Sequence, residues 1–294
     1  MESETSAALL HSGQTHASDM HPIPHILIQP KKNLLHLDLR EVWHYQELLY
    51  FLVWRDVKIR YKQTLIGAAW VMIQPLLTML VFAVVFGYFA GIPSDGVPYA
   101  IFAYTGLLPW NYFAQAVTRS GTSVVNNASL VSKVYFPRLI IPLAAVVSPV
   151  VDFLVAFLLL IGLMAWYRIV PSWGVLALPI FMLLAVITAW TISLFLSSLY
   201  VKYRDVGHII PFLTQLWMFA SPVVYPVSLV PEQWRLLYSL NPMVGVIEGF
   251  RWALLGKASP DFRIMTISAA VIIVLLWVGI IYFKKMERIF ADVI

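Results

Sequence analysis

The sequence predicts an all-α, polytopic membrane protein with six transmembrane helices. Three observations carry this prediction: long stretches without charge, a high apolar content and a low charged content. No charged residue lies between Thr64 and Ser94, and similar stretches recur along the chain. Hydrophobic residues make up 60% and charged residues 12% of the 294 residues, whereas about a quarter of a soluble domain is charged. Because about 20 apolar residues in a helix cross the hydrocarbon core of a bilayer, these stretches predict spanning helices.

Residues 1–34 form a polar segment with scattered histidines and prolines. So little apolar surface cannot offset the entropy cost of ordering, which predicts a disordered cytoplasmic tail. The four histidines of this tail have no spacing that fixes a metal geometry, so we predict no metal site there. The chain has no cysteine, which excludes disulfides and thiol chemistry.

Residues 35–64 are predicted to form an amphipathic interface helix. Apolar residues recur there at helical spacing, at Val42, Tyr45, Leu49 and Leu52, and a basic cluster closes the segment. A helix of this kind is expected to lie in the cytoplasmic membrane interface rather than to cross the bilayer. The alternative is a helix packed on a soluble partner, because the same apolar face serves either surface.

The transmembrane domain, residues 65–294, contains the six predicted spans. They are Ile66–Phe89, Val97–Val117, Leu139–Tyr167, Val175–Leu199, Val206–Val224 and Ile264–Phe283. Most Lys and Arg residues fall on the side of the membrane that holds both termini, which the positive-inside rule makes the cytoplasmic side. This orientation explains the net charge of +5 better than nucleic-acid binding does.

The connection between the fifth and sixth spans is predicted to form a re-entrant hairpin that dips in from the outer side. Its two helices, Glu232–Leu240 and Met243–Leu255, are separated by Asn241 and Pro242 and are too short to span. Glu248 and Arg251 lie three residues apart, so they can pair on one helix face. We interpret Asn241, Pro242, Glu248 and Arg251 as an outer gate. The alternative for the charged pair is internal neutralisation of a buried hairpin.

Asp152 is the one ionisable residue well inside a predicted span. A carboxylate at that depth is costly and normally faces a bundle interior or a cavity. It is either a proton or cation site, or a hydrogen-bonded acid that fixes helix packing. The second interpretation is favoured, because no other ionisable residue is expected at the same depth.

Aromatic residues are dense around the first outer loop and the second span. Those predicted to line a pathway are Tyr88, Tyr99, Phe102, Tyr104 and Trp110. Interfacial belts account for many aromatics in membrane proteins, but Phe102 and Tyr104 lie deeper than a belt requires. Their faces would suit the apolar C–H faces of sugar rings.

The loop before the third span combines aromatic and basic residues. It contains Lys133, Tyr135, Phe136, Pro137 and Arg138. We predict a short surface helix that ends at Pro137 and presents an apolar knob between cations to a cleft of a cytosolic protein. The alternative is ordinary anchoring in the membrane interface.

An ordered set of motifs from Leu35 onward resembles one known family. The motifs are Arg55–Gly67 with Trp70 and Gln74–Leu76, Gly106–Trp110, Asn126–Arg138, Arg204–Val206, Ser221–Pro226, and Asn241–Pro242 followed by Glu248 and Arg251. Together they resemble the transmembrane subunit of polysaccharide-exporting ABC transporters, the ABC-2 permease family that serves O-antigen, capsule and teichoic acid export.

The resemblance implies a homodimer surrounded by membrane lipids in a bacterial inner membrane, with two cytosolic ATP-binding ABC subunits. Its substrate would be a lipid-linked polysaccharide. ATPase coupling would involve Lys133, Tyr135, Phe136, Pro137 and Arg138, together with Arg55, Asp56 and Arg60 of the interface helix. The sequence contains no G-x-x-x-x-G-K-[ST] phosphate loop, so ATP hydrolysis would come from a separate subunit. No catalytic residue or cofactor is predicted.

Two other functions remain open at this point. A membrane-embedded lipid-linked glycosyl or acyl transferase would need paired carboxylates or a His–Asp site at one membrane face. An ion-coupled secondary transporter would usually show several intramembrane ionisable groups or broken helices in both halves.

Overall fold

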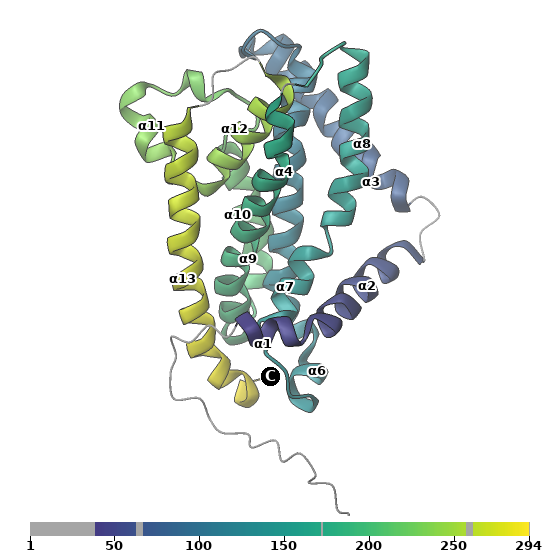
Figure 1. The fold of residues 1–294 in the computed structure, drawn as a ribbon, viewed down its shortest axis with the longest axis vertical. Helices are drawn as coiled ribbons and strands as arrows, with labels where there is room; N and C mark the ends of the chain where they lie inside the picture. The colour runs from purple at the N-terminus through teal and green to yellow at the C-terminus, as the bar shows by residue number, and fades with distance from the viewer. Residues whose placement is uncertain (1–38, 63–66, 172, 257–260, 294) are drawn as a thin grey trace, which may run out of the picture. The chain divides into compact units, whose positions relative to one another are not determined.

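The computed structural model describes residues 39–62, 67–171, 173–256 and 261–293 (Figure 1). Within these ranges the regular structure is helical and includes no strand, which confirms the all-α prediction. The predicted tail, residues 1–34, lies outside the described residues. So does the start of the predicted interface segment.

The helices follow one another along the chain with short connections. The first half contains α1 Leu39–His44, α2 Gln46–Lys62, α3 Gly67–Phe82 with its π-helical continuation η1 Ala83–Phe89, α4 Tyr99–Gly121, α5 Ser123–Asn126 and α6 Ala128–Lys133. The second half contains α7 Ile140–Val147, α8 Val150–Trp166, η2 Trp173–Ala177, α9 Leu178–Lys202, α10 Val206–Phe219, η3 Val227–Leu229, α11 Glu232–Tyr238, α12 Pro242–Leu255 and α13 Phe262–Val293.

Four helical segments are long and apolar enough to cross a membrane. They are Ala69–Phe89, Ile140–Trp166, Trp173–Lys202 and Phe262–Phe290. Each overlaps a predicted span, so the chain is a multi-pass helical membrane protein by length and composition. The count of six spans stays a prediction, as does the placement of α1 and α2 in the membrane interface.

The other two predicted spans differ from the structure in ways that the sequence explains. A helix does occupy the second predicted span, but α4 carries several tyrosines together with Thr105, Asn111 and Gln115, which lower its hydropathy. The fifth span was predicted to reach Val224, whereas α10 ends at Phe219. At 1.5 Å per residue, its 14 residues rise about 21 Å. The chain then turns irregularly around Pro222, which cannot continue the helical hydrogen bonding.

The third predicted span is interrupted in its interior. Helix α7 ends at Val147 and α8 begins at Val150, with Ser148 and Pro149 between them. Proline has no N–H and clashes with the preceding turn, so it breaks the helix here. As a result Asp152 lies in the first turn of a new helix, not in the middle of a continuous one.

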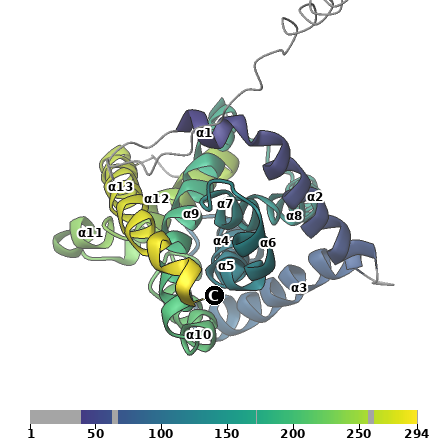
Figure 2. The same ribbon diagram turned by 90° about the horizontal axis from the view of Figure 1, so that it is seen from below.

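Helix α4 is the centre of the bundle. It packs against α3, α7, α8, α9, α10 and α12, and Figure 2 shows it enclosed by other helices when the fold is seen from below. Its tyrosines use their hydroxyls inside the core: Tyr104 donates to the carbonyl of Ala156 at 2.9 Å, and Tyr112 to that of Val146 at 3.1 Å. Buried tyrosines are tolerated when the hydroxyl finds a partner, and these two tie α4 to α8 and α7.

The connection before α13 contains the two short helices predicted there, α11 and α12, at the end of the bundle opposite α2 and α6 (Figure 1). Asn241 caps the start of α12, because its side chain accepts a hydrogen bond from the N–H of Met243, and Pro242 is the first helical residue. Gly256 follows the last residue of the helix and adopts the left-handed conformation with a φ of 63°. Insertion of this hairpin into a membrane stays a prediction.

Glycine lets α12 approach α13 closely. We predict that Gly245→Val lowers the unfolding temperature, because an added Cβ would lie 2.6 Å from Ser268 Cβ and 3.4 Å from Met265 Cα. Overpacking of this kind costs about 1–3 kcal/mol. The matched control is Gly162→Val in α8, where no described atom lies within 4 Å of the added Cβ. Thermal unfolding in detergent measures both variants, and an equal loss in the two would contradict the proposed contact.

Candidate functional site

Helix α2 is joined to the helix break between α7 and α8 by a buried polar cluster. Arg60 forms an ion pair with Asp152 and donates a 3.3 Å hydrogen bond to Ser148 Oγ, while the Tyr61 hydroxyl donates to the other carboxylate oxygen of Asp152. The Asp152 side chain is 5% exposed and that of Arg60 is 14% exposed. The cluster therefore holds the C-terminal part of α2 against the start of α8.

The chemistry of this cluster keeps Asp152 satisfied. A carboxylate in the first turn of a helix is favoured by the helix dipole, and the two donors from α2 supply the bonds that a buried acid needs. Burial and the hydrogen bond to Asp152 raise the pKa of Tyr61 to about 12, so Tyr61 stays protonated at neutral pH and can donate. These contacts agree with the packing interpretation of Asp152.

The partners of Asp152 were not predicted. The sequence patterns place Arg60 in an interface helix, outside the membrane, and Asp152 alone in a span. The available signal was Pro149, which predicts a helix break and hence a polar helix start three residues before Asp152. The identity of the partner could not be predicted, because Arg60 and Asp152 are 92 residues apart in the sequence.

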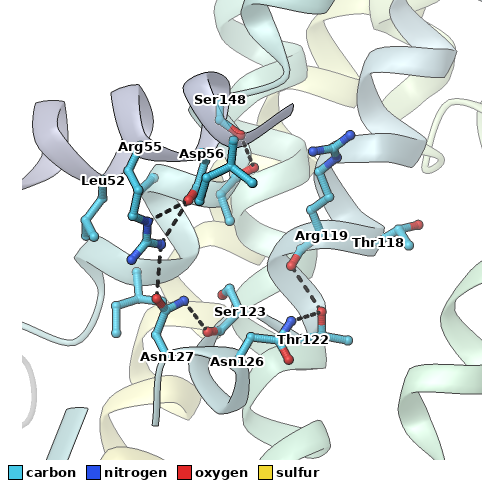
Figure 3. Close-up of a pocket in the computed structure, with 14 residues that line it drawn as sticks. Leu52, Arg55, Asp56, Thr118, Arg119, Thr122, Ser123, Asn126, Asn127 and Ser148 are labelled. Atoms are coloured by element: carbon cyan, nitrogen blue, oxygen red, sulfur yellow. Dashed lines mark hydrogen bonds and ion pairs between the residues drawn. The ribbon is translucent and has the colours of Figure 1, made fainter. Parts of the chain in front are cut away.

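A pocket opens beside this cluster, between α2, the end of α4, α5 and α7 (Figure 3). Arg55 lies on its wall and donates to Asp56 Oδ1 at 2.9 and 3.0 Å and to Asn127 Oδ1 at 3.0 Å. Asn127 in turn donates to the carbonyl of Ser123 at 2.8 Å. Of the residues predicted to couple to an ATPase from α2, Asp56 pairs with Arg55 in the same helix, Arg55 also reaches Asn127, and Arg60 reaches Asp152 in α8.

The loop predicted to dock a cytosolic partner is built differently from expectation. Its helix, α6, ends at Lys133, so Tyr135 to Arg138 are not helical, and Phe136 is buried at 5% exposure. Tyr135, in contrast, is 69% exposed. Arg138 donates to the carbonyl of Glu287 in α13 at 2.7 Å. Phe136 and Arg138 therefore fasten the segment, and Tyr135 is its accessible aromatic. Docking by this segment stays a prediction.

A second buried cluster surrounds Arg251 in α12. Its Nη1 donates to Glu248 Oε1 at 3.1 Å, which confirms the predicted pairing of these residues. Its Nη2 donates to the carbonyl of Val223 at 2.9 Å, and the guanidinium lies 3.7 Å from the ring centroid of Phe102. Gly106 leaves room for it, since a Cβ there would lie 2.8 Å from Nη2. Arg251 thus holds the irregular segment after α10 against α4.

Asn241 completes the attachment of that segment. Its Nδ2 donates to the carbonyl of Ala220 at 3.0 Å and to Ser221 Oγ at 2.9 Å, and its Oδ1 accepts from Trp217 Nε1 at 3.0 Å. The same oxygen caps α12 through Met243. Non-helical backbone that carries such internal partners is compatible with membrane depth. The role of Asn241, Pro242, Glu248 and Arg251 as an outer gate stays a prediction.

The aromatics predicted to line a pathway are mostly core residues. Phe102, Tyr104 and Trp110 are at most 2% exposed, because α4 is enclosed by its neighbours. A role for these three side chains along a pathway stays a prediction. Tyr99 is half-buried and donates to the carbonyl of Val224 at 2.6 Å, and Tyr88 is 81% exposed.

Comparison with known proteins gives one consistent result. A family model described as ABC-2 type transporter matches residues 47–255, from α2 to the end of α12. An O-antigen export system permease protein of Myxococcus xanthus is 31% identical over 86% of this chain and 98% of that protein. One from Klebsiella pneumoniae is 28% identical over 84% and 95%. A polysialic acid transport protein of Escherichia coli is 21% identical over 80% and 91%.

The Arg60–Asp152 pair yields a test of how α2 is held. We predict that Arg60→Gln destabilises the protein by about 3–5 kcal/mol, because it leaves a buried carboxylate without its cation. Adding Asp152→Asn to this variant removes the uncompensated charge and recovers part of the loss. Lys58→Gln, which removes an exposed cation from the same helix, is the control. Unfolding in detergent measures all three, and a double variant no more stable than Arg60→Gln would refute the pairing.

Proposed function

This chain belongs to the ABC-2 type transporter family, and we propose that it is the permease subunit of an ATP-driven exporter of lipid-linked polysaccharide in the bacterial inner membrane. The observation that carries the proposal is the match to export permeases over nearly their whole length, 98% of the Myxococcus xanthus protein. The named substrates of these relatives are O-antigen and polysialic acid, which favours polysaccharide over other cargo.

Energy for export would come from a second kind of subunit. The chain has no phosphate-binding loop of the G-x-x-x-x-G-K-[ST] type, so we propose two cytosolic ATP-binding subunits and a second copy of this permease. The relatives are permeases, which favours transport over the transferase alternative. Asp152 is engaged by Arg60 and Tyr61, which argues against its use as an ion-coupling site.

The contacts of α2 suggest how an ATPase could act on the helices. Arg55 links α2 to Asn127 between α5 and α6, and Arg60 links it to the start of α8. Arg138 links the loop after α6 to α13. A push on the α5–α6 segment, at the lower end of the bundle in Figure 1, would therefore reach α2, α8 and α13 through charged contacts.

Loss of the gene tests the function directly. We expect its deletion in the host to abolish polysaccharide at the cell surface and to leave completed glycan inside the cell. Restoring the chain should restore surface glycan only alongside an intact partner ATPase. Immunoblots of surface and internal glycan measure the outcome, and unchanged surface glycan after deletion would reject the proposal.

The docking part of the proposal has its own test. Tyr135→Asp should lower capture of the ATPase subunit by about tenfold or more, because it places a charge at an exposed apolar contact, worth about 1.4 kcal/mol per tenfold. Leu236→Asp in α11 is the matched control, since Leu236 is 68% exposed at the other end of the bundle. Co-purification of tagged permease with ATPase measures both, and equal capture would rule out docking at Tyr135.

Topology is tested by single cysteines. Because the chain has none of its own, Ser3→Cys and Ser228→Cys each introduce one reactive thiol. Cytoplasmic termini place residue 3 inside and the segment before α11 outside. We expect a membrane-impermeant maleimide to label Ser228→Cys in intact cells and Ser3→Cys only after lysis. Labelling of both in intact cells would overturn the orientation.

A further inference from the structure

The pocket beside α2 has a volume of about 590 Å³ and two kinds of wall. Leu52, Ile59 and Ile141 give it an apolar side, formed by α2 and α7. Arginine, hydroxyl and amide groups from α2, α4 and α5 give it a polar side. A cavity that joins a few convergent polar groups to an apolar lining is the usual form of a small-molecule site.

Two arginines stand on opposite sides of this pocket (Figure 3). Arg119, near the end of α4, is exposed, and its guanidinium has no hydrogen bond or ion pair within the described ranges. Arg55 uses Nε and Nη2 for Asp56 and Asn127, while its Nη1 makes no hydrogen bond to any described residue. Donors on both walls are therefore available to a ligand.

The charge of the residues around this pocket is positive. Arg60 donates to Ser148 Oγ, which belongs to the pocket wall, so a third guanidinium lies directly behind it. Three arginines face two nearby carboxylates, those of Asp56 and Asp152. Tyr61 contributes no negative charge, because its pKa is about 12. An anionic ligand would balance this excess.

We propose that this pocket binds a phosphate group, with Arg119 as the principal contact and Arg55 as the second. Arginine presents a planar fork of donors that matches phosphate oxygens, and it stays charged. A tetrahedral phosphate accepts hydrogen bonds from several directions, which suits arginines on opposite walls. A single carboxylate would satisfy one fork and leave the other unmatched.

The apolar side fits a phosphate that is attached to a hydrocarbon chain. Leu52 and Ile59 lie on the helix that is predicted to lie in the membrane interface, where lipid phosphates are found. The same chemistry could come from a lipid headgroup or from a free phosphate compound. Binding to this site does not depend on the proposed function, because it is measured without transport or ATP.

The test is equilibrium binding to the full-length chain in detergent, read out by native mass spectrometry. The probes are dioctanoyl phosphatidic acid, dioctanoylglycerol, which lacks only the phosphate, and inorganic pyrophosphate. We expect saturable binding of phosphatidic acid and none of dioctanoylglycerol. Displacement by pyrophosphate would show that phosphate alone suffices, and resistance to it would show that the lipid is required. Either result supports the site where binding depends on Arg119.

Variants of Arg119 test whether binding depends on this residue. Arg119→Gln should weaken phosphatidic acid binding by about tenfold or more, which is about 1.4 kcal/mol, because it removes the charged donor fork that meets the phosphate. Arg119→Lys keeps the charge and should retain more affinity than Arg119→Gln. Arg263→Gln, an exposed arginine at the start of α13, is the control and should bind like the parent. Because the Arg119 guanidinium makes no hydrogen bond within the described structure, variants of this side chain are expected to fold, and their unfolding temperatures check this. Equal binding by Arg119→Gln and the parent, or equal binding of both lipids, would overturn the proposal.

Discussion

A charge buried among apolar helices must be paired, and this constraint organises the chain. The hydrocarbon core of a bilayer contains no water that could hydrogen-bond an unpaired charge, so the protein itself must supply a partner. Two buried charges meet the requirement in different parts of the bundle. Asp152 is satisfied by Arg60 and Tyr61 from α2, and Arg251 by Glu248 and the carbonyl of Val223. In both cases the pairing holds a segment in place: helix α2 in one, the irregular connection after α10 in the other.

The two clusters differ in what they hold. At α2 the charged contacts run between separate helices, so movement of α2 changes them directly. At α12 the guanidinium of Arg251 also lies over the ring of Phe102 and fills the space left by Gly106. That arrangement leaves little freedom for Arg251 relative to α4. The cluster at α2 is therefore the better candidate for contacts that change when helices move, and the cluster at α12 for contacts that stay fixed.

Local patterns in the sequence predicted much of the fold. Apolar stretches located four helices that can span, and the Asn241–Pro242 pair separated α11 from α12 where the cap forms. The spacing of Glu248 and Arg251 predicted their ion pair. Long-range pairing was beyond these signals, because nothing local links Arg60 to Asp152. The burial of Phe136 and Tyr104 was not predicted for a related reason. The sequence alone does not distinguish an aromatic residue in a core from one in an interface or a pathway.

The burial of α4 bears on where a substrate could pass. Its side chains are occupied by six neighbouring helices of the same chain, and its aromatic residues serve packing. Large apolar side chains stay exposed elsewhere, including Leu77 and Val81 on α3 and Phe212 and Leu216 on α10. Lipid or a second copy would cover these faces. Under the proposed function, a path for polysaccharide would then run along α3 or α10, between two copies, because opening the core around α4 would leave the Tyr104 and Tyr112 hydroxyls without their carbonyl partners.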